Sequence, residues 1–177
     1  SNAVAHMVGY VGEVSRSELD DSVFPGAESG EIVGKQGLEL EYDSILRGRP
    51  GMRFVDVDSK GRMIREEQPA GIVVPVPGRN VHTTIDLGLQ RFVDSMWRAD
   101  LAGKRGALVA MTPQGDVLAY YSSPTFNPND FIGSIDRDTW NGLRNDPDKP
   151  LYNRVIQATY PPASPFKLAM AAMALRR

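Results

Sequence analysis

The C-terminal part of this chain contains the stretch Tyr160-Pro161-Pro162-Ala163-Ser164-Pro165-Phe166-Lys167, followed by a segment rich in Ala and Met. Residues three apart lie on one face of a helix, so a helix here brings Ser164 and Lys167 together. A lysine whose charge is suppressed by burial or by its neighbours can accept the proton of a serine hydroxyl, which makes the hydroxyl a nucleophile. The two prolines prevent an earlier helical start. The octapeptide therefore predicts a nucleophilic serine at a helix N-terminus, where backbone N–H groups stabilise an oxyanion.

The same octapeptide also has a purely structural interpretation. Serine is a favoured N-cap and proline the favoured first residue of a helix, and Lys167 is then a solvated side chain. With 12 serines and 5 lysines in the chain, a chance Ser-x-x-Lys match is expected about one time in three. The rest of the sequence has to decide between the two interpretations.

Several segments, in one consistent order, resemble class B penicillin-binding proteins, the transpeptidases that cross-link bacterial peptidoglycan. The octapeptide is similar to the family box Tyr-Pro-Pro-Gly-Ser-Thr-Phe-Lys. Segments that resemble the region before the transpeptidase domain are Val8-Gly9-Tyr10-Val11-Gly12-Glu13-Val14, Gly34-Lys35-Gln36-Gly37-Leu38-Glu39, Tyr42-Asp43 and Leu46-Arg47-Gly48. Segments that resemble the start of that domain are Thr84-Ile85-Asp86, Leu89-Gln90, the run 106–113, Ser123-Pro124 and Phe126-Asn127-Pro128-Asn129. Together they resemble the cell-elongation branch of the family most.

The resemblance implies an α+β chain in two parts. Residues 4–78 would form a pedestal, or dimerisation-type, segment with β-hairpins, and residues 79–177 the first helices and strands of a transpeptidase domain, a sheet flanked by helices. Residues 1–3 are interpreted as a cloning scar, that is, as residues left at the N-terminus by the cloning procedure. The family's Ser-x-Asn and Lys-Thr/Ser-Gly boxes do not occur in this sequence. We therefore expect a fragment that is truncated after the Ser-x-x-Lys helix and has little or no activity of its own.

For the intact parent, the resemblance implies a D,D-transpeptidase of cell-wall synthesis. Ser164 would attack the D-Ala-D-Ala bond of a peptidoglycan stem peptide, Lys167 would accept the serine proton, and the backbone N–H of Ser164 would form half of the oxyanion hole. β-Lactam antibiotics would acylate the same serine. The family needs neither a metal ion nor an organic cofactor for these steps.

Two residues of the octapeptide depart from the family pattern. Ala163 stands where the family has Gly, and a Cβ there disfavours left-handed backbone angles just before the nucleophile. Pro165 stands where the family has Thr, which removes one N–H and one hydroxyl from the edge of the site.

Composition excludes several other classes of protein. The formal net charge is −2 and no basic block occurs, so we expect no nucleic-acid partner. The chain has no cysteine and only two histidines, His6 and His82, which argues against thiolate chemistry, a zinc site or a His-dependent site. No run of about 18 apolar residues is present. By resemblance, the parent would act in the bacterial periplasm on an inner-membrane anchor that this chain lacks.

Two other functions stay open. Residues 8–80 would serve as a non-catalytic scaffold that binds and regulates the membrane glycan polymerase of the elongation machinery. A β-lactam sensor or β-lactamase shares the serine and lysine, but the pedestal-like segments argue against it. Loss of the later strands would expose the apolar faces of two helices, so a homodimer of the fragment is also expected.

Local patterns predict the secondary structure. Strands are expected over 8–14, 71–76 and 79–85, helices over 37–47 and 86–101, and hairpins from 52–57 with 62–67 and from 106–111 with 116–122. Residues 18–23 are expected to form a turn, and 24–37 and the polar region around 136–148 to form loops. Asn127 is expected to cap a turn, and Asn153-Arg154 to orient the start of the nucleophile helix.

Overall fold

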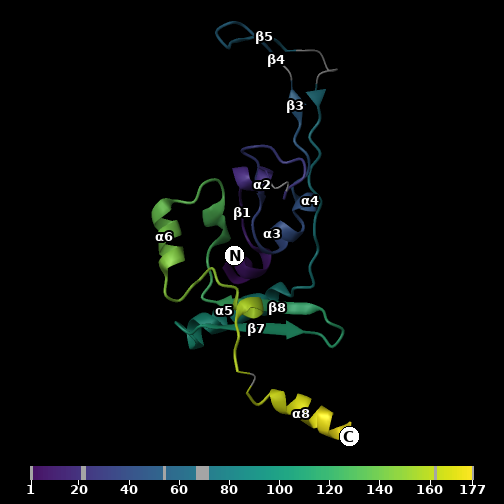
Figure 1. Cartoon of the computed structure of the whole chain (residues 1–177), viewed down its shortest axis with the longest axis vertical. Coiled ribbons are helices and arrows are strands. Elements are labelled where there is room, and N and C mark those ends of the chain that lie inside the picture. Colours follow the sequence, from purple (N-terminus) through teal and green to yellow (C-terminus); the bar gives the residue numbers. More distant parts are fainter. Residues whose placement is uncertain (1, 21–22, 54, 67–71, 162, 177) are drawn as a thin grey trace.

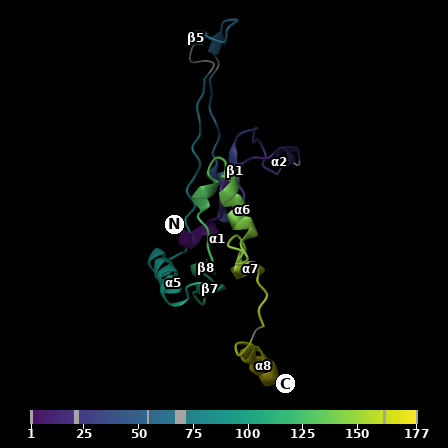
Figure 2. The ribbon, with the colours of Figure 1, turned by 90° about the vertical axis from the view of Figure 1, so that its left-hand side faces the viewer.

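The fold consists of a central body with two projections. A computed structural model describes residues 2–20, 23–53, 55–66, 72–161 and 163–176. An arm between Arg49 and Val76 projects at one end of the body, and the last helix lies apart from it at the other end (Figure 1). The view at right angles shows the same arrangement (Figure 2).

The N-terminal module is built around a small antiparallel sheet. In chain order it contains η1 Asn2–Val4, α1 Ala5–Val8, β1 Val11–Glu13, α2 Arg16–Asp20, β2 Ile32–Gly34, α3 Gly37–Glu41 and α4 Asp43–Leu46. β1 pairs with β2, with Val11 opposite Gly34. Val14, Phe24 and Val33 form the small core beneath this sheet.

Two glycines allow α1 and α3 to approach closely. Gly37 has φ 63°, and a Cβ built on it would lie 2.5 Å from the carbonyl oxygen of Met7. A Cβ on Gly9, which has φ 85°, would lie 1.8 Å from the carbonyl oxygen of Gln36. Only glycine combines positive φ with such contact, so both positions require it.

The arm is a pair of short two-stranded ladders. β3 Met52–Arg53 pairs with β6 Ile72–Val73, and β4 Val55–Val57 pairs with β5 Met63–Glu66. The turn between β4 and β5 is held by Asp58, whose Oδ1 accepts hydrogen bonds from the backbone N–H groups of Lys60 and Arg62. Gly61 has φ 76°. The predicted hairpin about residues 58–61 is confirmed, and its residues 54 and 67 lie outside the described part of the chain.

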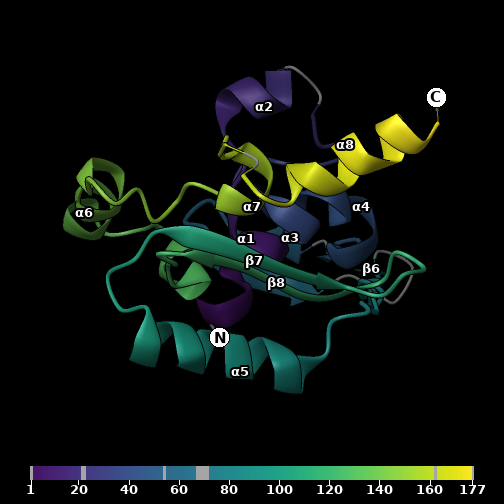
Figure 3. The same cartoon turned by 90° about the horizontal axis from the view of Figure 1, so that it is seen from below.

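The second module is a hairpin covered on both faces. It contains α5 Leu87–Asp100, β7 Gly106–Met111, β8 Val117–Ser123, η3 Pro128–Phe131, α6 Arg137–Asn145, α7 Arg154–Gln157 and α8 Phe166–Leu175. Helix α5 packs on one face of β7 and β8, and α1 and α7 lie on the other (Figure 3). Val93, Trp97, Ala119 and Tyr121 form the core under α5.

The two predicted elements of this module formed as expected. Helix α5 begins after Asp86, whose carboxylate accepts a hydrogen bond from Leu89 N at 2.9 Å, so Asp86 is the N-cap. The hairpin of β7 and β8 is also confirmed. Apolar residues recur along α5 at helical spacing, at Leu89, Phe92, Val93, Met96 and Trp97. Of these, Phe92 is 63% exposed, because the hairpin contacts the face that carries Val93 and Trp97.

Other expectations were wrong in detail. A helix, α2, forms over part of the predicted turn, and β2 forms inside the predicted loop because it pairs with β1. Within the predicted loop 24–37, the strand is limited to Ile32–Gly34. Within the predicted strand 8–14, it is limited to Val11–Glu13, and Val8 ends α1 instead of beginning a strand. The predicted helix over 37–47 is present but changes from α3 to α4 at Tyr42, and Gly48 follows it with φ 73°.

Two further predictions failed because tertiary contacts override local pattern. Residues 79–85 form no strand, and in the described part of 71–76 only Ile72–Val73 is strand, with an isolated bridge from Val76 to Arg49. Helix α6 occupies the region predicted to be loop. Its N-cap is Asp136, whose carboxylate accepts from the N–H groups of residues 138 and 139. Its Trp140 and Leu143 pack against Phe131 and its neighbours.

The N-terminal segment is joined to the second module by buried amide side chains. Gln90, which is fully buried, donates from Nε2 to Ala3 O and to Tyr120 O, and accepts from Tyr120 N at 2.8 Å. Asn153 donates from Nδ2 to His6 O at 3.0 Å. Each buried backbone group left without a partner would cost about 1–3 kcal/mol, so these contacts hold residues 3–6 against β8.

His6 lies at the centre of this contact and is held neutral. Its ring is 4% exposed, meets Phe126 edge-on, and donates from Nε2 to Pro150 O at 2.8 Å. Burial lowers the pKa of His6 to about 4, opposed by the hydrogen bond to Pro150 and assisted by the charge of Arg154. The unfolded chain therefore binds this proton more readily than the folded chain does.

We predict that stability falls as the pH drops from about 6.5 towards 4, the range between the unfolded and folded pKa values of His6. Between pH 7.5 and 5.0, the wild-type chain should lose about 2 kcal/mol more stability than His6→Gln, which cannot titrate. Urea unfolding at the two pH values measures this difference. His82→Gln, at an exposed position, should behave as wild type. Equal losses for wild type and His6→Gln would contradict the prediction.

Candidate functional site

The octapeptide forms a tight turn followed by a helix. Phe166 N donates to Ala163 O at 3.2 Å, Lys167 N to Ser164 O at 3.0 Å, and Leu168 N to Pro165 O at 3.2 Å. Helix α8 begins at Phe166, so Ser164 lies in the turn two residues before it. Within the described part of the chain, the Ser164 side chain caps no backbone group. The alternative interpretation, in which Ser164 is the N-cap, is therefore wrong, although the helix itself starts within two residues of the predicted place.

Ala163 adopts the left-handed backbone conformation that its family counterpart, Gly, would adopt more easily. Its φ is 46°, and the only other described non-glycine residue with positive φ is Lys149. A Cβ in this conformation costs about 1–2 kcal/mol per residue. The turn before Ser164 is thus built at the expense of local strain, since Ala163 adopts the left-handed angles that its Cβ disfavours.

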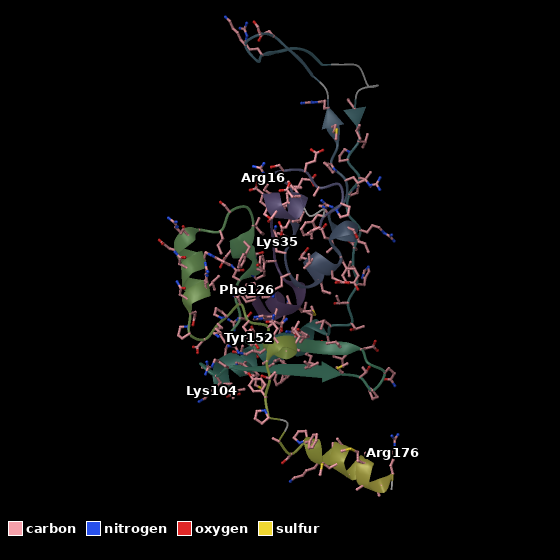
Figure 4. All side chains as sticks on the ribbon, viewed as in Figure 1. Arg16, Lys35, Lys104, Phe126, Tyr152 and Arg176 are labelled. Carbon is pink, nitrogen blue, oxygen red and sulfur yellow. The ribbon has the colours of Figure 1, made fainter. Side chains whose placement is uncertain are left out.

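Ser164 and Lys167 share this segment but are not joined to each other. Both side chains are exposed, and no hydrogen bond connects Ser164 Oγ with Lys167 Nζ or with any other described residue. The other side chains of α8 are also exposed, with Leu168 at 78% and Leu175 at 88%. Figure 4 shows Tyr152 in the body and Arg176 on the separate helix. The catalytic roles of Ser164 and Lys167, and the homodimer through exposed apolar faces, stay predictions.

The chain that leads to the octapeptide is firmly attached to the body. Asn153 is the N-cap of α7, since its Oδ1 accepts from Val155 N at 3.2 Å and from the Tyr120 hydroxyl at 3.0 Å. Arg154 is buried and donates to the carbonyl oxygens of residues 148, 149 and 152. This pair does orient the approach to the helix, but it acts at α7 and not at α8 itself.

A cavity of about 500 Å³ lies beside this approach. Its lining consists of Arg105, Lys149, Tyr152, Arg154, Ala158, Thr159 and Tyr160. Sequence analysis missed Arg105 and Lys149, because they are far apart in the chain and neither belongs to a recognisable motif. A larger cavity, of about 560 Å³, lies between β1 and the region of η3 and α6, and Tyr10, Phe131 and Trp140 are among its lining residues.

Other polar clusters have structural roles. The Asn127 side chain accepts from Asn129 N, which confirms the predicted turn cap. Asp136 caps α6, and Asp146 accepts from Asp148 N within a turn. Within the described residues, no three His, Cys, Asp or Glu side chains come together in a way that would hold a metal ion. No helix in the same part of the chain is long and apolar enough to cross a membrane.

We predict that Ala163→Gly stabilises the turn and raises the helical population of α8, because glycine removes the strain of φ 46°. The gain should be about 0.5–1 kcal/mol, since glycine also adds entropy to the unfolded segment. Amide hydrogen exchange of residues 167–175 measures it. The control Ala171→Gly, inside α8, should lower protection by about 1 kcal/mol. Lower protection in Ala163→Gly would refute the prediction.

Two protein-family models match different parts of the chain. The model of the penicillin-binding protein dimerisation domain matches residues 1–83, and that of the penicillin-binding protein transpeptidase domain matches residues 106–177. The second match includes the octapeptide with Ser164 and Lys167.

Curated relatives match almost the whole chain. The peptidoglycan D,D-transpeptidase MrdA of Acinetobacter baumannii is 38% identical over 167 residues, which cover 92% of this chain and 23% of that protein. The protein of the same name from Escherichia coli K12 is 35% identical over 179 residues, covering 98% of this chain and 27% of the relative. The chain therefore spans about a quarter of the length of these relatives.

Solved structures of similar proteins share the fold. A complex between penicillin-binding protein 2 (PBP2) and MreC from Helicobacter pylori superposes with a TM-score of 0.78 at 32% identity, covering 99% of this chain and 31% of that one. The crystal structure of Pseudomonas aeruginosa PBP2 in complex with WCK 5153 gives a TM-score of 0.72 at 34% identity, with coverage of 96% and 32%.

Proposed function

The chain belongs to the penicillin-binding protein family, and from this premise we propose that it supplies the acylated serine of a peptidoglycan D,D-transpeptidase of the cell-elongation type. The observation that carries the proposal is the octapeptide, which lies inside the region similar to the transpeptidase domain. The relatives named MrdA support the reaction, and the similarity to PBP2 structures supports the fold.

In the proposed reaction, Ser164 Oγ forms a bond to the carbonyl carbon of the D-Ala-D-Ala peptide bond of a stem peptide. The C–N bond then breaks and the terminal D-Ala leaves with a proton. Lys167 accepts the serine proton, and an amine of a neighbouring stem peptide resolves the acyl-enzyme. A β-lactam would be opened by the same attack. The backbone N–H of Ser164 makes no hydrogen bond within the described residues, which leaves it free to bind the oxyanion.

The 177 residues by themselves should be poor catalysts. Lys167 is exposed and makes no hydrogen bond to Ser164, so the proton acceptor is not held at the serine hydroxyl. The groups that would close the site around the substrate belong to family boxes that this sequence does not contain. We place the reaction in the bacterial periplasm, where the family's substrate is located.

We predict that the full-length gene product is acylated by benzylpenicillin on Ser164 and that Ser164→Ala abolishes the adduct. Lys167→Ala should slow acylation by about 10²–10⁴-fold, the usual contribution of a general base. Intact-mass measurement followed by peptide mapping tests both. Ser134→Ala, at an exposed serine, is the matched control and should react normally. The 177-residue polypeptide should stay at 19.4 kDa.

Two outcomes would argue against the proposal. An adduct that persists in Ser164→Ala would remove this serine from the mechanism. Stoichiometric acylation of the 177-residue polypeptide would show that the octapeptide and α8 need no further groups.

A second candidate function, binding of the membrane glycan polymerase, is favoured by the arm. Among the described residues, no element covers the exposed apolar side chains of the arm and its base. These are Met52, Ile72, Val73, Val74 and Val76, all between 46% and 72% exposed. Isolated strands with such surfaces are typical of binding sites. The complex of a similar PBP2 with MreC supports assembly with a protein partner, without identifying the polymerase as that partner.

For this function we predict that Val74→Asp weakens co-purification of the full-length gene product with the polymerase at least tenfold, because a charge would be buried in the interface. Phe92→Asp, which changes an exposed apolar residue on α5, should have no effect. Ser164→Ala should also bind normally, which separates binding from catalysis. Normal binding of Val74→Asp would exclude the arm as the docking surface.

A further inference from the structure

The cavity beside the chain segment that leads to Ser164 is lined by positively charged residues. Three of its seven lining residues, Arg105, Lys149 and Arg154, are basic, and none is acidic. The cavity lies between the start of β7, the loop before α7 and the segment 158–160. Tyr160, which begins the octapeptide, forms part of the wall. A group bound there would therefore touch the chain that carries the proposed nucleophile.

Arg154 places a buried positive charge in the lining of this cavity. It is 6% exposed and lies with its guanidinium carbon 5.5 Å from the centre of the Tyr152 ring. Its hydrogen-bond acceptors are the neutral carbonyl oxygens of residues 148, 149 and 152, at 2.5–3.3 Å. No ion pair between Arg154 and a carboxylate is present in the described part of the chain. The carbonyl groups satisfy its N–H donors, but they do not neutralise its charge.

The same contacts hold Lys149 at the rim. Arg154 binds the carbonyl oxygen of Lys149, and Lys149 N donates to Asp146 O at 2.9 Å. Lys149 keeps a φ of 47°, a conformation that non-glycine residues adopt infrequently. Its ammonium group is exposed and makes no ion pair among the described residues. The loop thus presents a second cation to the cavity.

Arg105 supplies the third cation, from the start of β7. The nearest carboxylate is Asp148, with Oδ1 at 3.8 Å from Arg105 Nε, which is beyond hydrogen-bond distance. Both side chains are more than half exposed, so this ion pair is weak. The planar fork of Arg105 consequently has N–H donors available to a ligand.

We propose that this cavity, which is lined by Arg105, Lys149 and Arg154, binds an oxyanion group, a carboxylate or a phosphate. A guanidinium fork matches two oxygens of either group, and an ammonium group adds a point charge. The Thr159 hydroxyl lies in the same wall and is a further donor. The site lies outside the Ser164–Lys167 pair, and its occupancy does not depend on acylation.

The test uses the ¹⁵N-labelled 177-residue chain and two probes at constant ionic strength. One probe is inorganic phosphate, and the other is N-acetyl-D-alanyl-D-alanine, which carries a peptide carboxylate. We expect saturable amide shifts at Arg105, Lys149 and Thr159. Saturable shifts with phosphate alone would identify a phosphate site, and saturable shifts with the dipeptide alone would identify a peptide carboxylate site. Saturable shifts with both probes would identify a general oxyanion site. Each of these results supports the proposal, and the absence of saturable shifts with both probes overturns it.

Three variants distinguish binding in this cavity from non-specific attraction of anions to basic residues of the protein. Arg105→Gln and Lys149→Gln should each weaken binding about 3–5-fold, as expected for loss of one partly solvated charge near 4 Å. The control Arg137→Gln, an exposed arginine on α6, should leave affinity unchanged. Equal weakening by all three variants would overturn the proposal. Unfolding midpoints should not change, since both cavity residues are exposed.

Ser164→Ala distinguishes this proposal from the proposed catalytic function. It should leave the binding of both probes unchanged while removing acylation of the full-length gene product. Loss of binding in Ser164→Ala would place the anion at the nucleophile and would overturn a separate site.

Discussion

This structure depends on one constraint: backbone polar groups that become buried need hydrogen-bond partners. Two amide side chains, Gln90 and Asn153, supply these partners. Gln90 satisfies Ala3 O and both backbone groups of Tyr120, and Asn153 satisfies His6 O. Without these partners, the carbonyl groups of Ala3 and His6, both in buried residues, would be unpaired, at about 1–3 kcal/mol each. With them, β8 is covered on the face opposite α5, and the hairpin of the second module becomes part of a core.

This contact also links the two regions that match different domain models. Residues 3–6 belong to the region similar to the dimerisation domain, yet they pack against the region similar to the transpeptidase domain. Asn153 is at the same time the N-cap of α7, and Arg154 arranges the loop that borders the cationic cavity. The body therefore holds the chain firmly up to α7. The arm and α8, in contrast, extend from it with their apolar side chains exposed (Figure 1).

Much of the fold could be predicted because it rests on local interactions. The Asp86 cap and the apolar spacing of α5, the β7–β8 hairpin and the turn before Gly61 are all set by residues close in sequence. Strand β2 and helix α6 were missed, because β2 exists through pairing with β1, and α6 is packed through Trp140 against Phe131. The purely structural interpretation made Ser164 the N-cap of α8, but the turn at Ala163 places it two residues before the helix.

The sequence by itself determined the family, the local elements and the Ser164–Lys167 pair, since each depends on the order and spacing of neighbouring residues. Only the tertiary structure decided which polar side chains are buried and what they satisfy. His6 meets Pro150, and Arg105 meets Lys149 and Arg154 around one cavity, across long separations in the chain. Hydrogen bonds and charges act through space, so no pattern of neighbouring residues records them. The cationic cavity therefore became visible only when the chain was folded.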